Sequence, residues 1–197
     1  MELNGIPVYK VTLSDDVVGM FGVALVSDPA MESDFLAFSK DGGKTMMQMS
    51  ILDADKRLVH GVLIRADFPI LRKDEKGNLY YVTFSKEVIR EIAERYVFNG
   101  FTSNFDLDHD HAQVVDGINL MQLYIKDVAK GVDPKGFEDI EDGSLFAEYK
   151  VHNDSVWEQI KKGVWTAFSL EAIVRTSPKD EPAIETIEDL LDYLNKS

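Results

Sequence analysis

The sequence predicts an α+β fold, with a mainly antiparallel, barrel-like β-sheet and two or three flanking helices. Two observations lead to this class. Short runs rich in Val, Ile, Leu, Tyr and Phe recur along the chain between turn residues, as is typical of antiparallel strands. Apolar residues at helical spacing occur in only a few segments, which lie between these runs. We therefore expect about eight strands and two or three helices in mixed order.

Strand-like runs dominate the first half of the chain. The four clearest are residues 6–13, 17–26, 57–66 and 79–84. The charged segment 73–78 lies between the last two and contains glycine and asparagine, so it predicts the tip of a hairpin. Residues 27–49 contain turn signals but no regular period, and we expect them to be irregular.

The second half contains two predicted helices. Apolar residues recur at helical spacing over 88–97, where Ser85 can cap the first turn and Asn99-Gly100 can end the helix. A shorter helix is expected over 154–162, ended by Gly163. The other extended segments are residues 105–111, 117–128, 144–151 and 165–174, with an acidic loop at 133–142.

We expect one folded domain over residues 1–175, followed by a linker and a helix over 176–197. Two prolines and several charges at 176–183 predict the linker. Beyond it, isoleucine and leucine residues form the apolar stripe of an amphipathic helix. That helix could dock on the body of the protein or on a partner.

The composition excludes several kinds of function. The 197 residues contain no cysteine, which rules out disulfides, thiolate catalysis and cysteine-ligated zinc. The net charge of −14 argues against nucleic-acid binding, which requires basic surface. No apolar stretch reaches the ~20 residues of a membrane helix and no signal peptide is visible, so no membrane association is expected. Nucleotide-binding glycine loops are missing, and no cofactor is expected.

The run 165–174 contains a serine in a pattern that indicates chemistry. In an extended run, successive side chains point to opposite faces. One predicted face is wholly apolar and consists of Phe168, Leu170, Ala172 and Val174. The other face carries a hydroxyl and a carboxylate among bulky neighbours and consists of Trp165, Ala167, Ser169 and Glu171. A serine becomes a nucleophile when a base such as histidine accepts its proton, which makes Ser169 the candidate nucleophile.

Two histidines in the alternating segment 105–111 are candidates for that base. If the segment is extended, His109 and His111 share the face of Phe105 and Leu107, and three aspartates face the other way. Partial desolvation lowers the pKa of a histidine and favours the neutral form that a general base needs. Taken alone, the segment fits a structural strand end with two incidental histidines slightly better than it fits a catalytic base.

The same two histidines allow a metal site as an alternative. His-x-His on a strand places two imidazoles on one face, an arrangement used for zinc, manganese or iron. Besides carboxylates, only His60 and His152 could add ligands, and both lie where a structural role is expected. Because a metal site would leave the serine strand unexplained, it ranks below serine chemistry, and no metal is expected.

Several segments carry a resemblance to a known family. They are residues 23–31 with 35–39, 59–64 with 69–72, 80–89, 107–110, 117–125, and 156–163 with 167–171. In this order they resemble the XkdF-like family of phage serine proteases, relatives of the prohead maturation proteases and herpesvirus assemblins. The resemblance covers roughly residues 18–175, and its strength lies in the order and number of short matches.

The resemblance implies an assemblin-like protease domain over 1–175, with Ser169 as the nucleophile and His109 as the base. His111 is the fallback base. The resemblance also implies that the protein cleaves phage scaffold and major capsid proteins during capsid maturation. It would then act in the host cytoplasm, inside the assembling prohead, as a homo-oligomer.

The residue that orients the base is not assigned by the resemblance. Glu171 lies on the predicted face of Ser169 and is preferred, with Asp108, Asp110 and Asp180 as alternatives.

Two departures from the family pattern leave other functions open. Ala167 and Ala172 stand where the family has glycines around the serine. The alternatives are a non-catalytic scaffold module that keeps the protease fold, a metallohydrolase built on His109 and His111, and a structural protein whose C-terminal stripe docks on partners.

Overall fold

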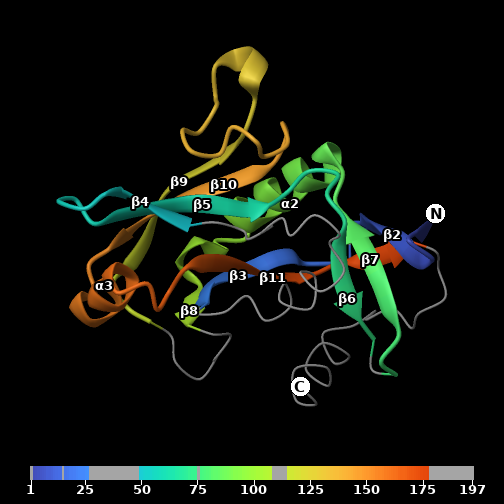
Figure 1. Ribbon diagram of the computed structural model, residues 1–197, viewed down its shortest axis with the longest axis horizontal. Helices are drawn as coiled ribbons and strands as arrows, with labels where there is room; N and C mark the ends of the chain where they lie inside the picture. Colours follow the sequence, from blue (N-terminus) through green and yellow to red (C-terminus); the bar gives the residue numbers. More distant parts are fainter. Residues whose placement is uncertain (1, 15, 27–48, 75, 108–114, 178–197) are drawn as a thin grey trace.

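The computed structural model describes residues 2–14, 16–26, 49–74, 76–107 and 115–177 (Figure 1). The described strands are β1 (Glu2–Leu3), β2 (Ile6–Thr12), β3 (Gly19–Val26), β4 (Met49–Asp53), β5 (Leu58–Ile64), β6 (Ile70–Lys73), β7 (Leu79–Thr83), β8 (Phe105–Leu107), β9 (Ile118–Ile125), β10 (Leu145–Val151), β11 (Ala167–Ile173) and β12 (Arg175–Ser177). The described helices are α2 (Lys86–Phe98) and α3 (Asp154–Lys161), with short 3₁₀ turns η1 (Phe101–Ser103) and η2 (Val128–Lys130). The predicted α+β class is confirmed.

The described strands form three sheets. A five-stranded sheet has the order β1-β2-β7-β6, with β12 also paired to β2. A four-stranded sheet has the order β4-β5-β10-β9, and a three-stranded sheet has the order β11-β3-β8. All pairings between the described strands are antiparallel except β2 with β7 and β3 with β8.

The prediction of a barrel-like sheet is wrong for the part of the chain that the structure describes. Its strands divide among three separate sheets instead of closing into one barrel, and two of these sheets are mixed. A barrel requires strand order, tilt and register to be mutually consistent around a closed ring. The alternation of apolar residues identifies strands, but it carries no information about which strand lies beside which.

Most of the predicted strands are confirmed, and the hairpin tip is among them. β6 and β7 pair antiparallel, and the backbone and side-chain amides of Asn78 both donate to the Asp74 carboxylate, at 2.7 and 2.8 Å. The structure adds β4, whose first residue, Met49, belonged to the segment expected to be irregular. Residues 27–48 lie outside the described residues.

Both predicted helices are confirmed together with their caps. The Ser85 hydroxyl accepts from the Val88 amide (3.3 Å) at the start of α2, and Gly100 follows its end with a φ of 74°. The Asn153 side chain accepts from the Val156 amide (3.1 Å) at the start of α3. Satisfying an otherwise orphaned amide in this way is worth about 1 kcal/mol to a helix.

The main core lies between the three-stranded and four-stranded sheets. Phe105 and Phe168 from the first sheet contact Tyr149 from the second, with ring centroids 4.8 and 5.2 Å from the Tyr149 ring. Both helices pack against this core through one apolar stripe each. The buried helical residues are Ile89, Ile92 and Tyr96 of α2 and Val156, Trp157 and Ile160 of α3.

The acidic segment 133–142 covers the opposite face of the four-stranded sheet. Phe137 and Ile140 pack there on Val62 and Phe146 in a second, smaller cluster. The Lys126 side chain, only 2% exposed, holds the segment in place. Its Nζ donates to the carbonyls of Phe137 (2.8 Å) and Glu138 (3.2 Å) and lies 2.9 Å from the Asp133 carboxylate.

The folded part extends two residues beyond the predicted domain boundary. β12 pairs with β2, so Thr176 and Ser177, which were expected in a linker, belong to a sheet. Residues 178–197 lie outside the described residues, and the C-terminal helix stays a prediction. Among the described helices, none is long and apolar enough to cross a membrane.

Candidate functional site

Ser169 lies near the middle of β11, in one row with residues of two other strands. In the antiparallel ladder of β11 and β3, Ser169 is opposite Ala24. In the parallel ladder of β3 and β8, Ala24 is opposite Asp106. Residues opposite one another in a ladder project to the same face of the sheet. Ser169, Ala24 and Asp106 therefore form one row across the three-stranded sheet.

The predicted alternation along the serine strand is largely confirmed. Phe168 is fully buried in the main core, and Leu170 and Ala172 pack against it. Ala167 belongs instead to a small cluster with Ala24 and Val26. Two faces with different chemistry result: an apolar face toward the core, and a second face that carries Ser169.

One part of the predicted alternation is wrong. Trp165 was expected on the face of Ser169, but it packs in the main core. It precedes β11, whose first residue is Ala167, so the strand period does not extend to it. The ladder also slips between Glu171 and Ala172, which limits regular alternation to the first part of the strand.

Glu171 is placed on the second face with its carboxylate over β3. The residue is 9% exposed and lies opposite Gly22. A Cβ atom at position 22 would collide with Oε2 of Glu171. The glycine is therefore what allows this carboxylate to lie against the backbone of β3, beside the row of Ser169.

Asp106 is a further candidate for the site, and the sequence alone did not point to it. It is only 6% exposed, although an aspartate is rarely buried unless it is paired or functional. The alternation of Phe105, Asp106 and Leu107 did place the aspartate opposite the apolar residues. Its position in the row of Ser169 depends on the parallel pairing of β8 with β3, which no local pattern reveals.

The two candidate bases lie outside the described residues. His109 and His111 follow Leu107, the last residue of β8. Asp108, Asp110 and Asp180 also lie outside. The structure thus brings Ser169 and Glu171 to one face and adds Asp106, and the assignment of His109 or His111 as the base stays a prediction.

The two described histidines lie apart from this face. His60 is buried in β5, and its ring meets that of Phe137 edge-on with centroids 5.0 Å apart. Burial lowers its pKa below the ordinary value of 6.5. The expected role of His60 as a packed strand residue is confirmed. His152 is exposed between β10 and α3.

A metal cluster is not formed by the residues that the structure describes. No group of three or more histidine, aspartate or glutamate side chains comes together there in a way that could hold an ion. The alternative site built on His109 and His111 lies outside these residues.

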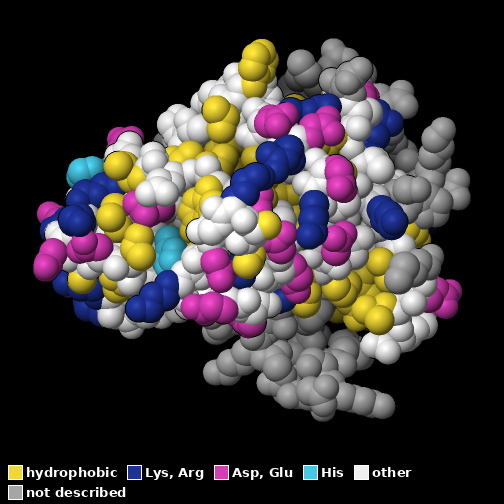
Figure 2. Space-filling model, turned by 90° about the horizontal axis from the view of Figure 1, so that it is seen from above, with side chains coloured by type: hydrophobic (Ala, Val, Ile, Leu, Met, Phe, Trp, Pro, Cys, Tyr) yellow, Lys and Arg dark blue, Asp and Glu magenta, His cyan; other side chains and the backbone are white. Residues whose placement is uncertain are grey.

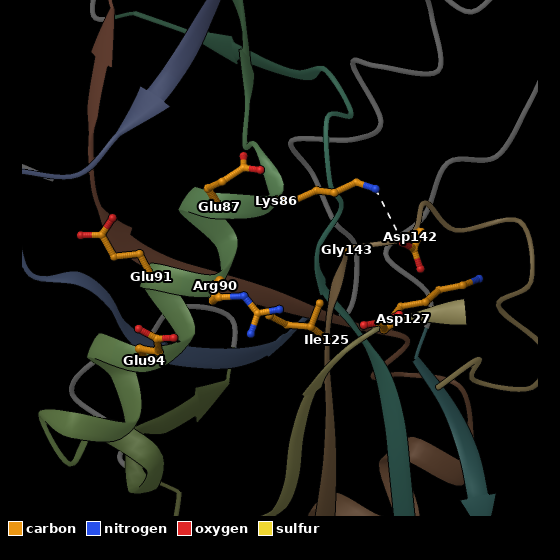
Figure 3. Close-up of a pocket in the computed structure, with 10 residues that line it drawn as sticks. Lys86, Glu87, Arg90, Glu91, Glu94, Ile125, Asp127, Asp142 and Gly143 are labelled. Atoms are coloured by element: carbon orange, nitrogen blue, oxygen red, sulfur yellow. Dashed lines mark ion pairs between the residues drawn. The ribbon is translucent and has the colours of Figure 1, made fainter. Parts of the chain in front are cut away.

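A groove of about 520 Å³ lies between α2 and the ends of β9 and β10, away from Ser169. Figure 3 shows the acidic side chains of α2 along one wall, with Lys86 paired to Asp142 of the opposite wall at 3.6 Å. Seen from above, basic and acidic side chains are interspersed over the middle of the molecule (Figure 2). Exposed ion pairs of this kind are common on surfaces and carry no sign of catalysis.

The comparison with known families identifies the kind of protein to which this serine strand belongs. The family model described as "Putative phage serine protease XkdF" matches residues 45–177. Because the match covers more than half of the chain, the protein belongs to this family. The matched region contains β8 and β11 and therefore both Asp106 and Ser169. No match was found among curated proteins or among solved structures.

Proposed function

We propose that the protein is a serine endopeptidase that matures the phage capsid, with Ser169 as its nucleophile. The observation that carries the proposal is the position of Ser169. It lies on a strand of the core sheet, on a face shared with the buried carboxylates of Asp106 and Glu171, in a chain of a phage serine protease family. A face that needed only to pack would be better filled by apolar side chains.

The reaction follows from an activated serine. The Ser169 oxygen attacks the scissile carbonyl while His109 accepts its proton, and the same proton then passes to the leaving amine. Water attacks the resulting acyl-enzyme in the reverse sense, which releases the second product and restores Ser169. His111 is the second candidate base. Glu171 is the preferred carboxylate for orienting the base.

The geometry places one requirement on this mechanism. Ser169 is on the face of Asp106. Strict alternation beyond β8 would carry His109 to the opposite face, together with Phe105 and Leu107. The mechanism therefore requires the alternation to end between Leu107 and His109.

The proposed substrates are segments of phage scaffold and major capsid proteins, cleaved inside the assembling prohead in the host cytoplasm. A homo-oligomer is the proposed working state. The net charge of −14 disfavours the packaged nucleic acid as a partner, because a phosphate backbone attracts basic surface.

The first test is covalent labelling of the serine. The full chain is incubated with a fluorophosphonate probe, with and without its scaffold protein, and the labelled residue is identified by mass spectrometry. Labelling is expected at Ser169 and is expected to disappear in Ser169→Ala and His109→Ala. Cleavage of scaffold should fall by about 10⁶ in either variant, since neither half of a serine–histidine pair works alone.

Ser50→Ala is the matched control for this test. Ser50 is the serine that the described structure places opposite a histidine, His60, in a neighbouring strand. Its replacement should leave labelling unchanged. If wild-type protein reacts at Ser50, or not at Ser169 in the presence of scaffold, the proposed nucleophile is wrong. The second outcome would favour a non-catalytic module with the protease fold. Cleavage that survives in Ser169→Ala and is lost with a chelator would favour the metallohydrolase.

A further inference from the structure

β9 forms one edge of the four-stranded sheet. The sheet has the order β4-β5-β10-β9, so among the described strands β9 pairs with β10 alone. Its eight residues, Ile118–Ile125, include no charged side chain and no proline. Natural edge strands are commonly protected from further pairing by charges and prolines. Neither kind of residue prevents a further strand from pairing with β9.

The backbone groups on the outer side of β9 can be assigned from the residue that follows it. The Lys126 N–H donates to the Ser144 carbonyl (2.9 Å), and the Lys126 carbonyl accepts from the Gly143 N–H (2.9 Å). Both groups of Lys126 thus point toward the β10 side. In an antiparallel ladder, successive residues direct their N–H and C=O alternately to the two sides of the strand. Those of Leu123 and Ile125 therefore point away from β10.

The ladder is regular over the last four residues of β9. Its register shifts at Met121, which has no partner in β10, and it is regular again from Gln122 to Ile125. A bulge of this kind limits how far a second strand can pair along an edge. The stretch 122–125 is about 13 Å long, so we expect an added strand to pair over about four residues.

The groove beside α2 begins at this stretch. Ile125 lies on one side of the groove, and Glu87, Arg90 and Glu94 of α2 lie on the other (Figure 3). A strand that paired with Ile125 would therefore lie between β9 and α2. Extended peptides bind in this way to exposed sheet edges, where main-chain hydrogen bonds give affinity and the neighbouring side chains give specificity.

The charge of the groove favours a basic occupant. Five carboxylates and three basic side chains line it. Two of the three basic side chains are already paired, Lys86 with Asp142 and Lys126 with Asp133, whereas Glu94 is exposed on the wall formed by α2. A second copy of the chain would bring the same carboxylates and a further net charge of −14. Complementary charge therefore disfavours a second copy and favours a positively charged segment.

We propose that β9 and α2 form a docking site for an extended, basic segment of a partner protein, which adds to the edge of β9 as a further strand. The backbone of that segment bonds to the N–H and C=O groups of Leu123 and Ile125. Alternate side chains of an added strand point to one face, and the basic ones on the side of α2 meet Glu87 and Glu94. The site does not involve Ser169 and does not depend on the proposed function.

The first test uses two fluorescent octapeptides with blocked ends and the full chain. One peptide alternates lysine and valine, and its counterpart has glutamate in place of lysine. Fluorescence anisotropy should show that the lysine peptide binds at least about tenfold more tightly. On binding, amide exchange measured by NMR should slow at Leu123 and Ile125, while Tyr124, whose N–H points to β10, should not change. Equal binding of the two peptides, no binding, or unchanged exchange at both outer amides would overturn the proposal.

A pair of proline variants tests strand addition. Leu123→Pro removes an outward N–H, and proline is tolerated in an edge strand at such a position. Ile51→Pro is the matched control in β4, the other edge of the same sheet. The Met49 N–H bonds to Thr166 outside this sheet, so Ile51, two residues later, also points outward. With thermal midpoints showing that both variants fold, only Leu123→Pro should lose peptide binding, and equal binding by the two would exclude pairing at β9.

A pair of charge variants tests the groove without changing the backbone. Glu94→Lys and Glu158→Lys alter the net charge equally, but Glu158 lies on α3 and is exposed there. Glu94→Lys is expected to weaken binding of the lysine peptide by about five- to tenfold, and Glu158→Lys by less than about twofold. Equal weakening would mean that the peptide responds only to the overall charge, which would overturn the docking site.

The competing occupant of the edge is a second copy of the chain. Sedimentation velocity of wild type and Leu123→Pro distinguishes the two, because pairing through β9 would make a dimer that the proline abolishes. The proposal expects the same oligomeric state for both proteins. A wild-type dimer that becomes a monomer in Leu123→Pro, but not in Ile51→Pro, would assign the edge to a second copy and overturn the basic partner.

Discussion

At the scale of single residues, the buried His60 makes the stability of the protein depend on pH. The ring lies against Phe137, with Ser50 and Glu148 opposite it in the neighbouring strands. Burial lowers the pKa of the ring from 6.5, so the folded state holds a proton less readily than the unfolded chain. The stability that depends on the neutral ring is present above about pH 6.5 and is lost as the pH falls through the folded-state pKa.

We therefore expect the free energy of unfolding to fall less on acidification in His60→Phe than in wild type. The measurement is urea unfolding at about pH 7.5 and pH 5.5, on either side of the ordinary histidine pKa. His152→Gln is the control, since His152 is exposed, and its pH dependence should match wild type. An identical pH dependence in all three proteins would show that protonation of His60 does not change the free energy of unfolding.

The residues of the site were predictable only in part. The alternation in 165–174 was enough to separate Ser169 and Glu171 from the core side chains Phe168 and Leu170, because each of these relations is local. Asp106 could not be found in this way. It meets Ser169 through β3, and its register follows from contacts far apart in sequence.

At the scale of elements, the buried Lys126 is one of two basic residues that attach the segment 133–142 to its sheet; the other is Arg65, which pairs with Glu141. Lys126 donates to two carbonyls of the segment and pairs with Asp133. Lys126→Met keeps most of the apolar stem but leaves the carbonyls without their donor. We expect it to destabilise the protein by about 1–3 kcal/mol, and to raise amide exchange in 133–142 above that of the neighbouring β10. Both quantities are accessible from denaturation and hydrogen-exchange mass spectrometry.

Lys130→Met provides the comparison for Lys126. Lys130 pairs with Asp127 three residues away, but it is largely exposed. Surface pairs of this kind contribute about 0–1 kcal/mol, so this variant should stay close to wild type in stability and in exchange. Equal effects of the two substitutions would mean that the buried bonds of Lys126 contribute no more to holding the segment than an exposed ion pair does.

Elements with strong local signals were predicted well, and those defined by distant pairing were not. α2 and α3 carry apolar spacing and capping residues within their own segments, so their bounds were recovered closely. β4 and β12 are short, and each exists because a partner strand accepts its hydrogen bonds, β5 and β2 respectively. The same limitation led to the incorrect expectation of a barrel.

At the scale of the whole molecule, the five-stranded sheet joins distant parts of the chain. β2 pairs with β1 and β7, and it also pairs with β12 near the end of the described residues. The ladder of β12 and β2 is reinforced by an ion pair between Arg175 and Asp16. The family match ends at Ser177, the same residue that ends β12.

This coincidence predicts different consequences for two truncations three residues apart. A chain ending at Ser177 keeps β12, whereas one ending at Val174 loses its backbone pairs and the Arg175–Asp16 contact. A net contribution of about 1 kcal/mol per backbone hydrogen bond predicts that the shorter chain is less stable by roughly 2–3 kcal/mol. β12 leads directly out of β11, the strand of Ser169, so labelling at Ser169 should be retained by 1–177 and weakened in 1–174. Denaturant unfolding and the labelling rate of both chains test this. Equal stability would mean that the pairing of β12 with β2 does not stabilise the fold. The end of the family match at Ser177 would then have a reason unrelated to folding.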